Sequence, residues 1–404
     1  MARTVASLPA GSRITDYISL GVIAKFFPVQ RIESILKETG KASVRKRDLP
    51  AHVVLYYVIA LALYMRASYR EVLRCLLEGL QWLLDPSPTL KVAGKSGISQ
   101  ARTRLGSEPV KKLYQTVVTP MATEQTQGAW YRGWRLVSLD GSTLDVADTA
   151  ENEAAFGRPA ASRGSSAYPQ IRFVALLESG THVLTGAQMA GCRTDETALA
   201  KQVIPRLQKG MLCLADRYYL GYELWRKAEH RRGPALASQE ERPSGHRETF
   251  ARRVLSEPDL SVHRRSGPSA EGYGSPVEYR LEGIPGAEPL YRLVTTILDH
   301  RPAPAKELAA LYQERWEIET TLDELKTHLR GARIVLRSKT PDLVRQEFYG
   351  LLLAHFAIRG LMHEAALQAK EDPDRLSFVH AVHVVQRRLP RFVAIPPSAQ
   401  KSIP

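Results

Sequence analysis

The sequence predicts an α/β core that carries a mostly β insertion and is flanked by an all-α N-terminal domain and C-terminal helices. Three observations favour this fold class. Apolar residues recur every three or four positions from about residue 14 to residue 118, which is helical spacing. Short apolar runs at residues 134–140 and 211–216 each end in an aspartate. Strand-like pieces that alternate polar and apolar residues then precede a return to helical spacing at residue 305.

The composition bounds the class of protein. The 404-residue chain is long enough for two or three domains, and its 44% apolar content is typical of a globular protein. A net charge of +14 predicts an anionic partner, and nucleic acid is the leading candidate. Basic runs are spread along the chain, as expected of a protein that follows a long polyanion. They occupy residues 45–47, 231–232, 252–253, 264–265 and 387–388.

Several other classes are disfavoured. The three cysteines are too few and too widely spaced for a disulfide framework or a zinc module, which indicates a reducing cytoplasm. The apolar runs are too short or too interrupted to span a bilayer, so we expect no membrane partner and no export. A phosphate-binding loop at Gly94, Lys95 and Ser96 would need a glycine where Thr89 stands, so we expect no nucleotide cofactor. Zinc chemistry through a His-Glu-x-x-His string has no support.

The first predicted domain is the helical N-terminal region, residues 1–128. Pro50 stands where a helix can begin, just before the apolar run at residues 53–65. A helical DNA-binding domain fits this region, and so does a plain helical core, because periodicity cannot distinguish them.

Residues 129–218 form the first part of the predicted core. Apolar runs at residues 134–140, 171–177 and 182–187 predict three strands, the last two joined by a hairpin turn. A helix over residues 196–208, broken at Pro205, separates them from a fourth strand at 211–216. Asp140 and Asp216 thus each end a strand, and open α/β sheets place ligands at the carboxyl ends of their strands. The Gly141 and Ser142 pair predicts a turn after the first acid, and residues 151–168 predict a loop.

The remaining segments follow the same logic. Residues 219–304 predict a β-rich insertion, with strand-like pieces at 277–281 and 291–298, while Trp225 is assigned to the core. Helices are predicted over residues 305–329, 343–367 and 376–389. We assign residues 305–365 to the remainder of the core and residues 366–404 to a C-terminal helix and a loosely ordered tail.

The predicted helix over residues 305–329 carries four polar side chains at a distinctive spacing. Tyr312, Arg315, Glu319 and Lys326 follow one another at intervals of three, four and seven residues. At about 100° of rotation per residue, the four fall within roughly 60° of one another on a single helix. A solvated surface helix also alternates charges, but the two upstream aspartates give Glu319 partners.

Three separated acids, Asp140, Asp216 and Glu319, are a ligand set for divalent metal ions. Carboxylate oxygens suit two Mg²⁺ ions, with Mn²⁺ as a substitute. Such a pair of ions activates an attacking oxygen and stabilises a leaving oxygen during phosphodiester transfer. The cationic neighbours on the helix can contact phosphates, and the tyrosine hydroxyl can donate a hydrogen bond to one.

These residues resemble a known signature. The Tyr-x2-Arg-x3-Glu-x6-Lys string is similar to that of DDE transposases of the insertion-sequence-4 family, in the ribonuclease H-like superfamily. Matching segments surround the other two acids, Leu139-Asp-Gly-Ser-Thr-Leu-Asp145 and Ala215-Asp-Arg-Tyr-Tyr. The N-terminal region, with its Ser68-Tyr-Arg-Glu-Val72 segment, is similar to the N-terminal domain common in that family. The resemblance spans residues 14 to 390.

The resemblance implies a ribonuclease H-like core and a cut-and-paste DNA transposase. It implies that Asp140, Asp216 and Glu319 are the catalytic metal ligands. The DNA contacts that it implies are Tyr312, Arg315 and Lys326. Arg217, directly after the second acid, is a further candidate DNA contact. The partner would be double-stranded DNA, both the terminal inverted repeats of the element and the target, bound by a homodimer in the synaptic complex. The protein would lie in the bacterial cytoplasm, associated with the nucleoid when on DNA.

Alternatives remain open at this point. A ribonuclease H-like nuclease would cleave DNA without strand transfer, and an inactivated transposase would act as a DNA-binding regulator. Glu319 is preferred over Glu317 and Asp323 because only Glu319 satisfies both the arginine and the lysine spacing. Asp323 is expected to form a salt bridge with Lys326 or Arg330.

Overall fold

The computed structural model describes residues 18–44, 49–84, 93–159, 168–219, 221–230, 235–238, 260–264, 275–281, 290–297, 299, 301–332 and 334–386. The chain divides into two compact units. Unit 1 contains Met1–Met121, Leu144–Gln170 and Asp323–Pro404, and unit 2 contains Ala122–Thr143 and Ile171–Leu322. Within the described residues, no helix combines the length and the apolar character that crossing a membrane requires.

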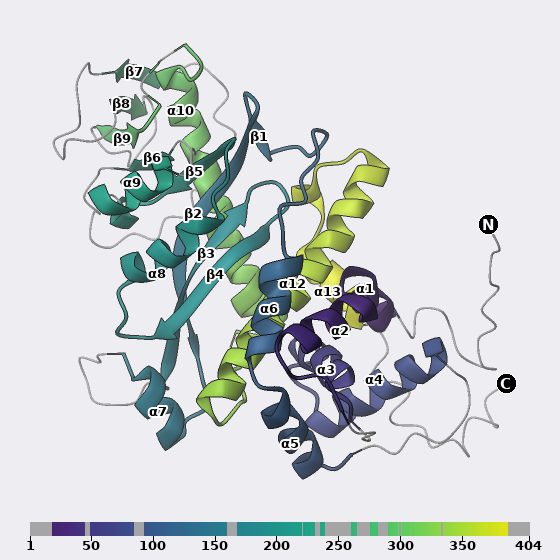
Figure 1. The fold of residues 1–404 in the computed structure, drawn as a ribbon. Helices are drawn as coiled ribbons and strands as arrows, with labels where there is room; N and C mark the ends of the chain where they lie inside the picture. The colour runs from purple at the N-terminus through teal and green to yellow at the C-terminus, as the bar shows by residue number, and fades with distance from the viewer. Residues whose placement is uncertain are drawn as a thin grey trace. The chain divides into compact units, whose positions relative to one another are not determined.

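Unit 1 is helical, as the spacing of its apolar residues predicts (Figure 1). Its helices are α1 (Ile18–Phe26), α2 (Val29–Glu38), α3 (Ala51–Leu63), α4 (Tyr69–Leu84), α5 (Lys95–Leu105), α6 (Glu108–Val117), α7 (Ala150–Phe156), α12 (Pro341–Ala369) and α13 (Phe378–Gln386). Pro50 precedes the first turn of α3, as expected. Helix α3 is apolar on all sides and packs along α12, so it forms the centre of this unit.

A buried polar network joins the N-terminal helices of unit 1 to α12. Arg102 is 2% exposed, and its guanidinium donates to Gln346 Oε1 at 2.8 Å and to Ser338 Oγ at 2.9 Å. The amide of Gln346 donates back to the Arg102 carbonyl at 3.1 Å. Because a buried charge is costly unless it is hydrogen-bonded, these contacts fix the position of α5 on α12.

Most of a nine-stranded mixed sheet lies in unit 2 (Figure 1). The strands are β1 (Trp130–Tyr131), β2 (Trp134–Asp145), β3 (Gln170–Glu178), β4 (Val183–Gly191), β5 (Met211–Ala215), β6 (Ala235–Ser238), β7 (Leu260–Arg264), β8 (Ser275–Leu281) and β9 (Tyr291–Thr295). Their order is β4-β3-β2-β5-β6-β9-β8-β7, with β1 paired to β2. Strand β5 runs parallel to both β2 and β6, which places it at the centre of the sheet.

Helices cover both faces of this sheet. Residues of α8 (Glu196–Val203) and α9 (Tyr222–His230) pack on one face, in an apolar cluster that includes Trp225. Residues of α10 (Ala305–Leu311) pack on the other face with Leu212 and Leu214 of β5. The predicted order of three strands, a helix and a fourth strand is confirmed, and so is the core position of Trp225.

Two local predictions in the core segment are wrong. Strand β2 does not end at Asp140 but continues through Gly141 and Ser142 to Asp145, because it remains paired in the sheet beyond its contact with β5. Residues 150–156 form helix α7 and not a loop. The Thr149 hydroxyl caps this helix by accepting a hydrogen bond from the Asn152 backbone N–H at 3.2 Å.

The predicted helix over residues 305–329 is not one regular helix. Helix α10 is followed by a 3₁₀ segment (Tyr312–Trp316), by α11 (Glu317–Asp323) and by a π segment (Glu324–Leu329). These three geometries rotate the chain by different amounts per residue, so the common face calculated for a uniform helix holds only over short stretches.

The β-rich insertion extends the sheet of the core. Its predicted pieces at residues 277–281 and 291–298 correspond to β8 and β9, and β6 joins them to β5 by backbone pairing. The C-terminal tail after residue 386 and the basic runs, apart from Arg264, lie outside the described residues.

Candidate active site

The register between β2 and β5 brings two of the predicted acids to adjacent positions. The last paired residues of these parallel strands are Leu139 and Ala215, and Asp140 and Asp216 follow them directly. Neighbouring strands lie about 4.8 Å apart, so the two aspartates leave the parallel pair side by side. Leu139 and Ala215 belong to the α8 cluster, and side chains alternate along a strand. The next residue on β2, Asp140, therefore projects toward the face that α10 covers.

The electrostatics of Asp140 show which charges surround it. Burial is the main reason that the pKa of its carboxyl rises to about 7. The negative charges of Asp216 and Glu319 raise this pKa further, whereas the Gly141 backbone N–H, 2.7 Å from Oδ1, and the Arg315 guanidinium lower it. The structure therefore brings Asp216 and Glu319 each within electrostatic range of Asp140, and all three acids lie inside unit 2.

The segment after α10 supplies the third acid and its cation. Arg315 is 7% exposed, and its Nη1 lies 3.7 Å from Oε1 of Glu319, one helical turn away. The guanidinium also lies 4.5 Å from the centre of the Trp316 ring. Among the described residues, the Arg315 Nε atom has no hydrogen-bond partner although it is buried. The Glu319 side chain is 49% exposed, so its carboxylate remains accessible.

Tyr312 lies beside the end of β5. The side chain is buried, and its hydroxyl donates to the Ala215 carbonyl at 3.0 Å. This hydroxyl thus contacts the strand directly before Asp216, and its contact with a DNA phosphate stays a prediction. Arg217 is exposed on the short 3₁₀ turn Arg217–Tyr219, beside the second acid.

Comparison with known proteins identifies the family. The model of the insertion element 4 transposase N-terminal domain matches residues 17–115, and that of the transposase DDE domain matches residues 132–357. Transposase InsG of insertion sequence element IS4 from Escherichia coli K12 is 30% identical over 379 residues, which cover 91% of this chain and 82% of InsG. The chain belongs to the insertion sequence 4 family of DDE transposases.

Two further matches are more distant. The putative transposase InsZ of Escherichia coli K12 is 26% identical to this transposase over 207 residues, which cover 51% of the chain and 66% of InsZ. The cryo-EM structure of the piggyBac transposase synaptic complex with hairpin DNA covers 96% of the chain, and the chain covers 84% of it. Its TM-score of 0.46 and its 11% identity are too low to carry an argument about fold.

A fourth carboxylate of this transposase lies close to Gly141, the residue after the first acid, and was not predicted from the sequence. Glu196, in the first turn of α8, accepts a hydrogen bond from the Tyr219 hydroxyl at 3.2 Å, and Arg172 lies 3.6 Å away. A Cβ atom at Gly141 would come within 2.7 Å of Glu196 Oε2 and 3.0 Å of the Tyr219 hydroxyl. A side chain at position 141 would therefore displace the Glu196 carboxylate from its present position. The sequence signal was only a helix start after Asp195, which indicates a cap and no site.

The end of the glutamate segment carries two further residues named in the sequence analysis. Lys326 lies on the π segment, in unit 1, and its contact with DNA stays a prediction. The Asp323 carboxylate, expected to pair with Lys326 or Arg330, contacts His328 Nε2 at 3.4 Å and accepts a hydrogen bond from the Thr327 hydroxyl. The wider π turn explains the difference, because it changes which residues of the segment face each other.

Proposed function

We propose that this transposase performs cut-and-paste excision and strand transfer of its own element with Asp140, Asp216 and Glu319 as its metal-binding triad. The observation that carries the proposal is the register of β2 and β5, which sets Asp140 beside Asp216 at the edge where Glu319 contributes to the electrostatics of Asp140. The DDE family supports divalent metal chemistry in general, and we propose Mg²⁺ as the physiological ion.

The residues fit a pair of hard cations. The donors are carboxylate oxygens, which Mg²⁺ and Mn²⁺ prefer. The raised pKa of Asp140 reflects burial and unbalanced negative charge, which Arg315 offsets only in part, and a bound cation would balance it. When bound, divalent ions would activate the attacking oxygen and stabilise the leaving oxygen in phosphodiester transfer.

The surrounding side chains have separate proposed roles. Arg315, with its buried unpartnered Nε, and the exposed Arg217 would contact phosphates of the DNA end. Lys326 is proposed as a further phosphate contact from the π segment. Tyr312 would hold the end of β5, and with it Asp216, through its bond to the Ala215 carbonyl.

The substrate and architecture complete the proposal. We expect a ribonuclease H-like core, with the N-terminal helices contributing to DNA binding and a homodimer joining two ends of the element. The net charge of +14 supports binding to terminal inverted repeats and target DNA, because neutralising phosphates releases counterions.

The test uses purified full-length protein, a duplex that carries the end of the element, and Mg²⁺. The Ala variants of Asp140, Asp216 and Glu319 should each abolish nicking and joining. Asp148→Ala is the matched control, because that exposed carboxylate pairs with Arg158 in unit 1. The triad is refuted when the three variants nick and join like the wild type.

A second substitution series tests metal ligation directly. Each acid is replaced by Cys, whose thiolate prefers softer ions than Mg²⁺. Cleavage by Asp140→Cys should return in Mn²⁺ more than in Mg²⁺, whereas Asp140→Ala should stay inactive in both. An inactive Asp323→Ala beside an active Glu319→Ala would move the third ligand to Asp323 and overturn the proposed triad.

A further inference from the structure

The turn between β3 and β4 is buried, which is unusual for a hairpin turn. Such turns normally lie on the surface, because their backbone groups need water or partners. Here Glu178, Ser179, Thr181 and His182 are all at most 4% exposed. The turn also contains Gly180 at φ +76° and His182 at φ +58°, both in the left-handed region. Surrounding structure must therefore hold this turn in place.

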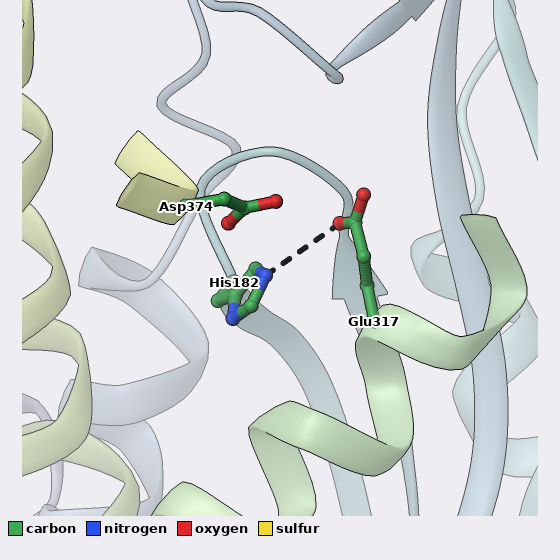
Figure 2. A group of neighbouring side chains, drawn as sticks. All are labelled: His182, Glu317 and Asp374. Carbon is green, nitrogen blue, oxygen red and sulfur yellow. Dashed lines mark ion pairs between the residues drawn. The ribbon is translucent and has the colours of Figure 1, made fainter. Parts of the chain in front are cut away.

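Glu317 supplies one of the contacts that hold the turn. Its Oε2 atom accepts a hydrogen bond from the Gly180 backbone N–H at 2.8 Å and lies 3.7 Å from Nε2 of His182 (Figure 2). A Cβ at position 180 would come within 2.5 Å of the Gln127 carbonyl, so the turn has no room to shift toward residue 127. Asp374, which Figure 2 also labels, belongs to unit 1 and has no part in this inference.

The other end of the turn is tied to the strand that carries the first acid. Glu178 is fully buried and forms an ion pair with Arg135 of β2. Its Oε2 atom accepts hydrogen bonds from the Thr181 hydroxyl at 2.6 Å and from the Ala122 backbone N–H at 3.1 Å. A continuous set of contacts thus links Glu317 through the turn to β2, five residues before Asp140.

The geometry of α11 relates the position of Glu317 to that of Glu319, the third acid. Glu317 and Glu319 are two residues apart in α11, so about 200° of rotation separates them and they point to opposite sides. The Glu317 side chain is 11% exposed, whereas that of Glu319 is 49% exposed and has a 3.7 Å ion pair with Arg315. A fixed Glu317 therefore sets the rotation and depth at which α11 presents Glu319.

We propose that Glu317 is a positioning residue that holds the β3–β4 turn against α11 and thereby sets Glu319 at its distance from Asp140. The proposal rests on the metal-ligand role proposed above for Glu319. Glu317 itself faces the turn, so its proposed role is to position Glu319 and not to bind the DNA.

The test compares Glu317→Ala with Glu317→Gln, whose amide oxygen can still accept the Gly180 N–H. Binding of Mn²⁺ by the full-length protein without DNA is measured from the electron paramagnetic resonance signal of the free ion. Glu317→Ala should raise the half-saturating Mn²⁺ concentration roughly tenfold, as loss of one hydrogen bond to a charged group would. Glu317→Gln should stay close to the wild type.

Two further measurements accompany the binding curves. Hydrogen exchange of the peptide that contains Gly180 should be faster in Glu317→Ala and unchanged in Glu317→Gln. Cleavage of an element end by Glu317→Ala should recover toward the wild-type rate at saturating Mg²⁺. Glu314→Ala is the matched control, because Glu314 precedes α11 and its carboxylate makes no hydrogen bond or ion pair among the described residues.

The outcomes separate the proposal from simpler explanations. Wild-type Mn²⁺ affinity in Glu317→Ala overturns it. So does a loss of cleavage that saturating Mg²⁺ does not relieve, because that pattern indicates a purely structural role. Wild-type Mn²⁺ affinity and cleavage in Glu319→Ala would instead refute the metal role of Glu319, whatever Glu317 does.

Discussion

Replacing Asp140 by Asn should stabilise the metal-free transposase at neutral and alkaline pH, and it should also abolish DNA cleavage. The carboxyl of Asp140 has its pKa raised from 3.8 to about 7, mainly by burial and further by Asp216 and Glu319. Above pH 4 the unfolded chain releases this proton readily, whereas the folded chain retains it until about pH 7. Ionised Asp140 therefore destabilises the folded state, and the uncharged Asn removes this destabilisation.

The size of the effect follows from the two pKa values. The difference between 3.8 and about 7 corresponds to about 4 kcal/mol, at 1.36 kcal/mol per pKa unit. Asp140 is only partly shielded from solvent, so we expect about 1–2 kcal/mol in practice. Because the folded pKa is raised, the wild type loses this stability as the pH rises from about 4 to about 7, and the loss is complete above that range.

Urea unfolding of metal-free wild type and Asp140→Asn at about pH 5 and pH 8 measures this difference. The advantage of the variant should grow between the two pH values. Asp195→Asn is a control of opposite sign, because the Thr197 N–H lowers the pKa of Asp195, the N-cap of α8. That variant should be less stable than the wild type at both pH values. An Asp140→Asn advantage that is absent at pH 8, or equal at the two pH values, would refute the electrostatic reasoning.

Three other outcomes are expected. Gly141→Ala should lower the rate of DNA cleavage by roughly tenfold to a hundredfold, because its Cβ would displace Glu196 and the Tyr219 hydroxyl next to the residue that follows the first acid. The measurement is the cleavage rate at equal concentrations of folded protein. Glu324→Gln should destabilise unit 1 by about 3–5 kcal/mol in urea unfolding, since it leaves the buried Arg359 without its charge partner. DNA affinity measured in binding titrations should fall steeply with salt, and a flat response would contradict the phosphate contacts.

Much of the central sheet could be predicted from the sequence. Strands β3, β4 and β5 are apolar runs bounded by turn residues, and a five-residue run such as β5 has few alternatives to a buried strand. The pairing of Leu139 with Ala215 cannot be predicted from either apolar run alone. It follows from parallel pairing in the folded sheet, and that pairing is what places Asp140 beside Asp216.

The missed elements have two different causes. The length of β2 past Asp140 depends on pairing with a neighbouring strand, which local composition does not reveal. Helix α7 was within reach of the sequence, since Thr149 is a good N-cap and residues 150–156 contain three alanines and two glutamates. The glycine and serine residues further along residues 151–168 favoured a loop instead.

The spacing of Tyr312, Arg315, Glu319 and Lys326 shows which side-chain contacts helical periodicity can predict. An i, i+4 contact between Arg315 and Glu319 is present, as the helical spacing predicts. Upstream, the Tyr312 hydroxyl bonds to a backbone carbonyl on β5, which a face calculation cannot anticipate.

Downstream, the chain enters a π segment at Glu324, whose buried carboxylate pairs with Arg359 and lies 3.3 Å from His355. A buried ion pair of this kind requires close approach of both partners, and a π turn is one way for a helix to supply it. Lys326 lies two residues later on the same π segment, so its placement depends on this turn as well as on its spacing from Glu319.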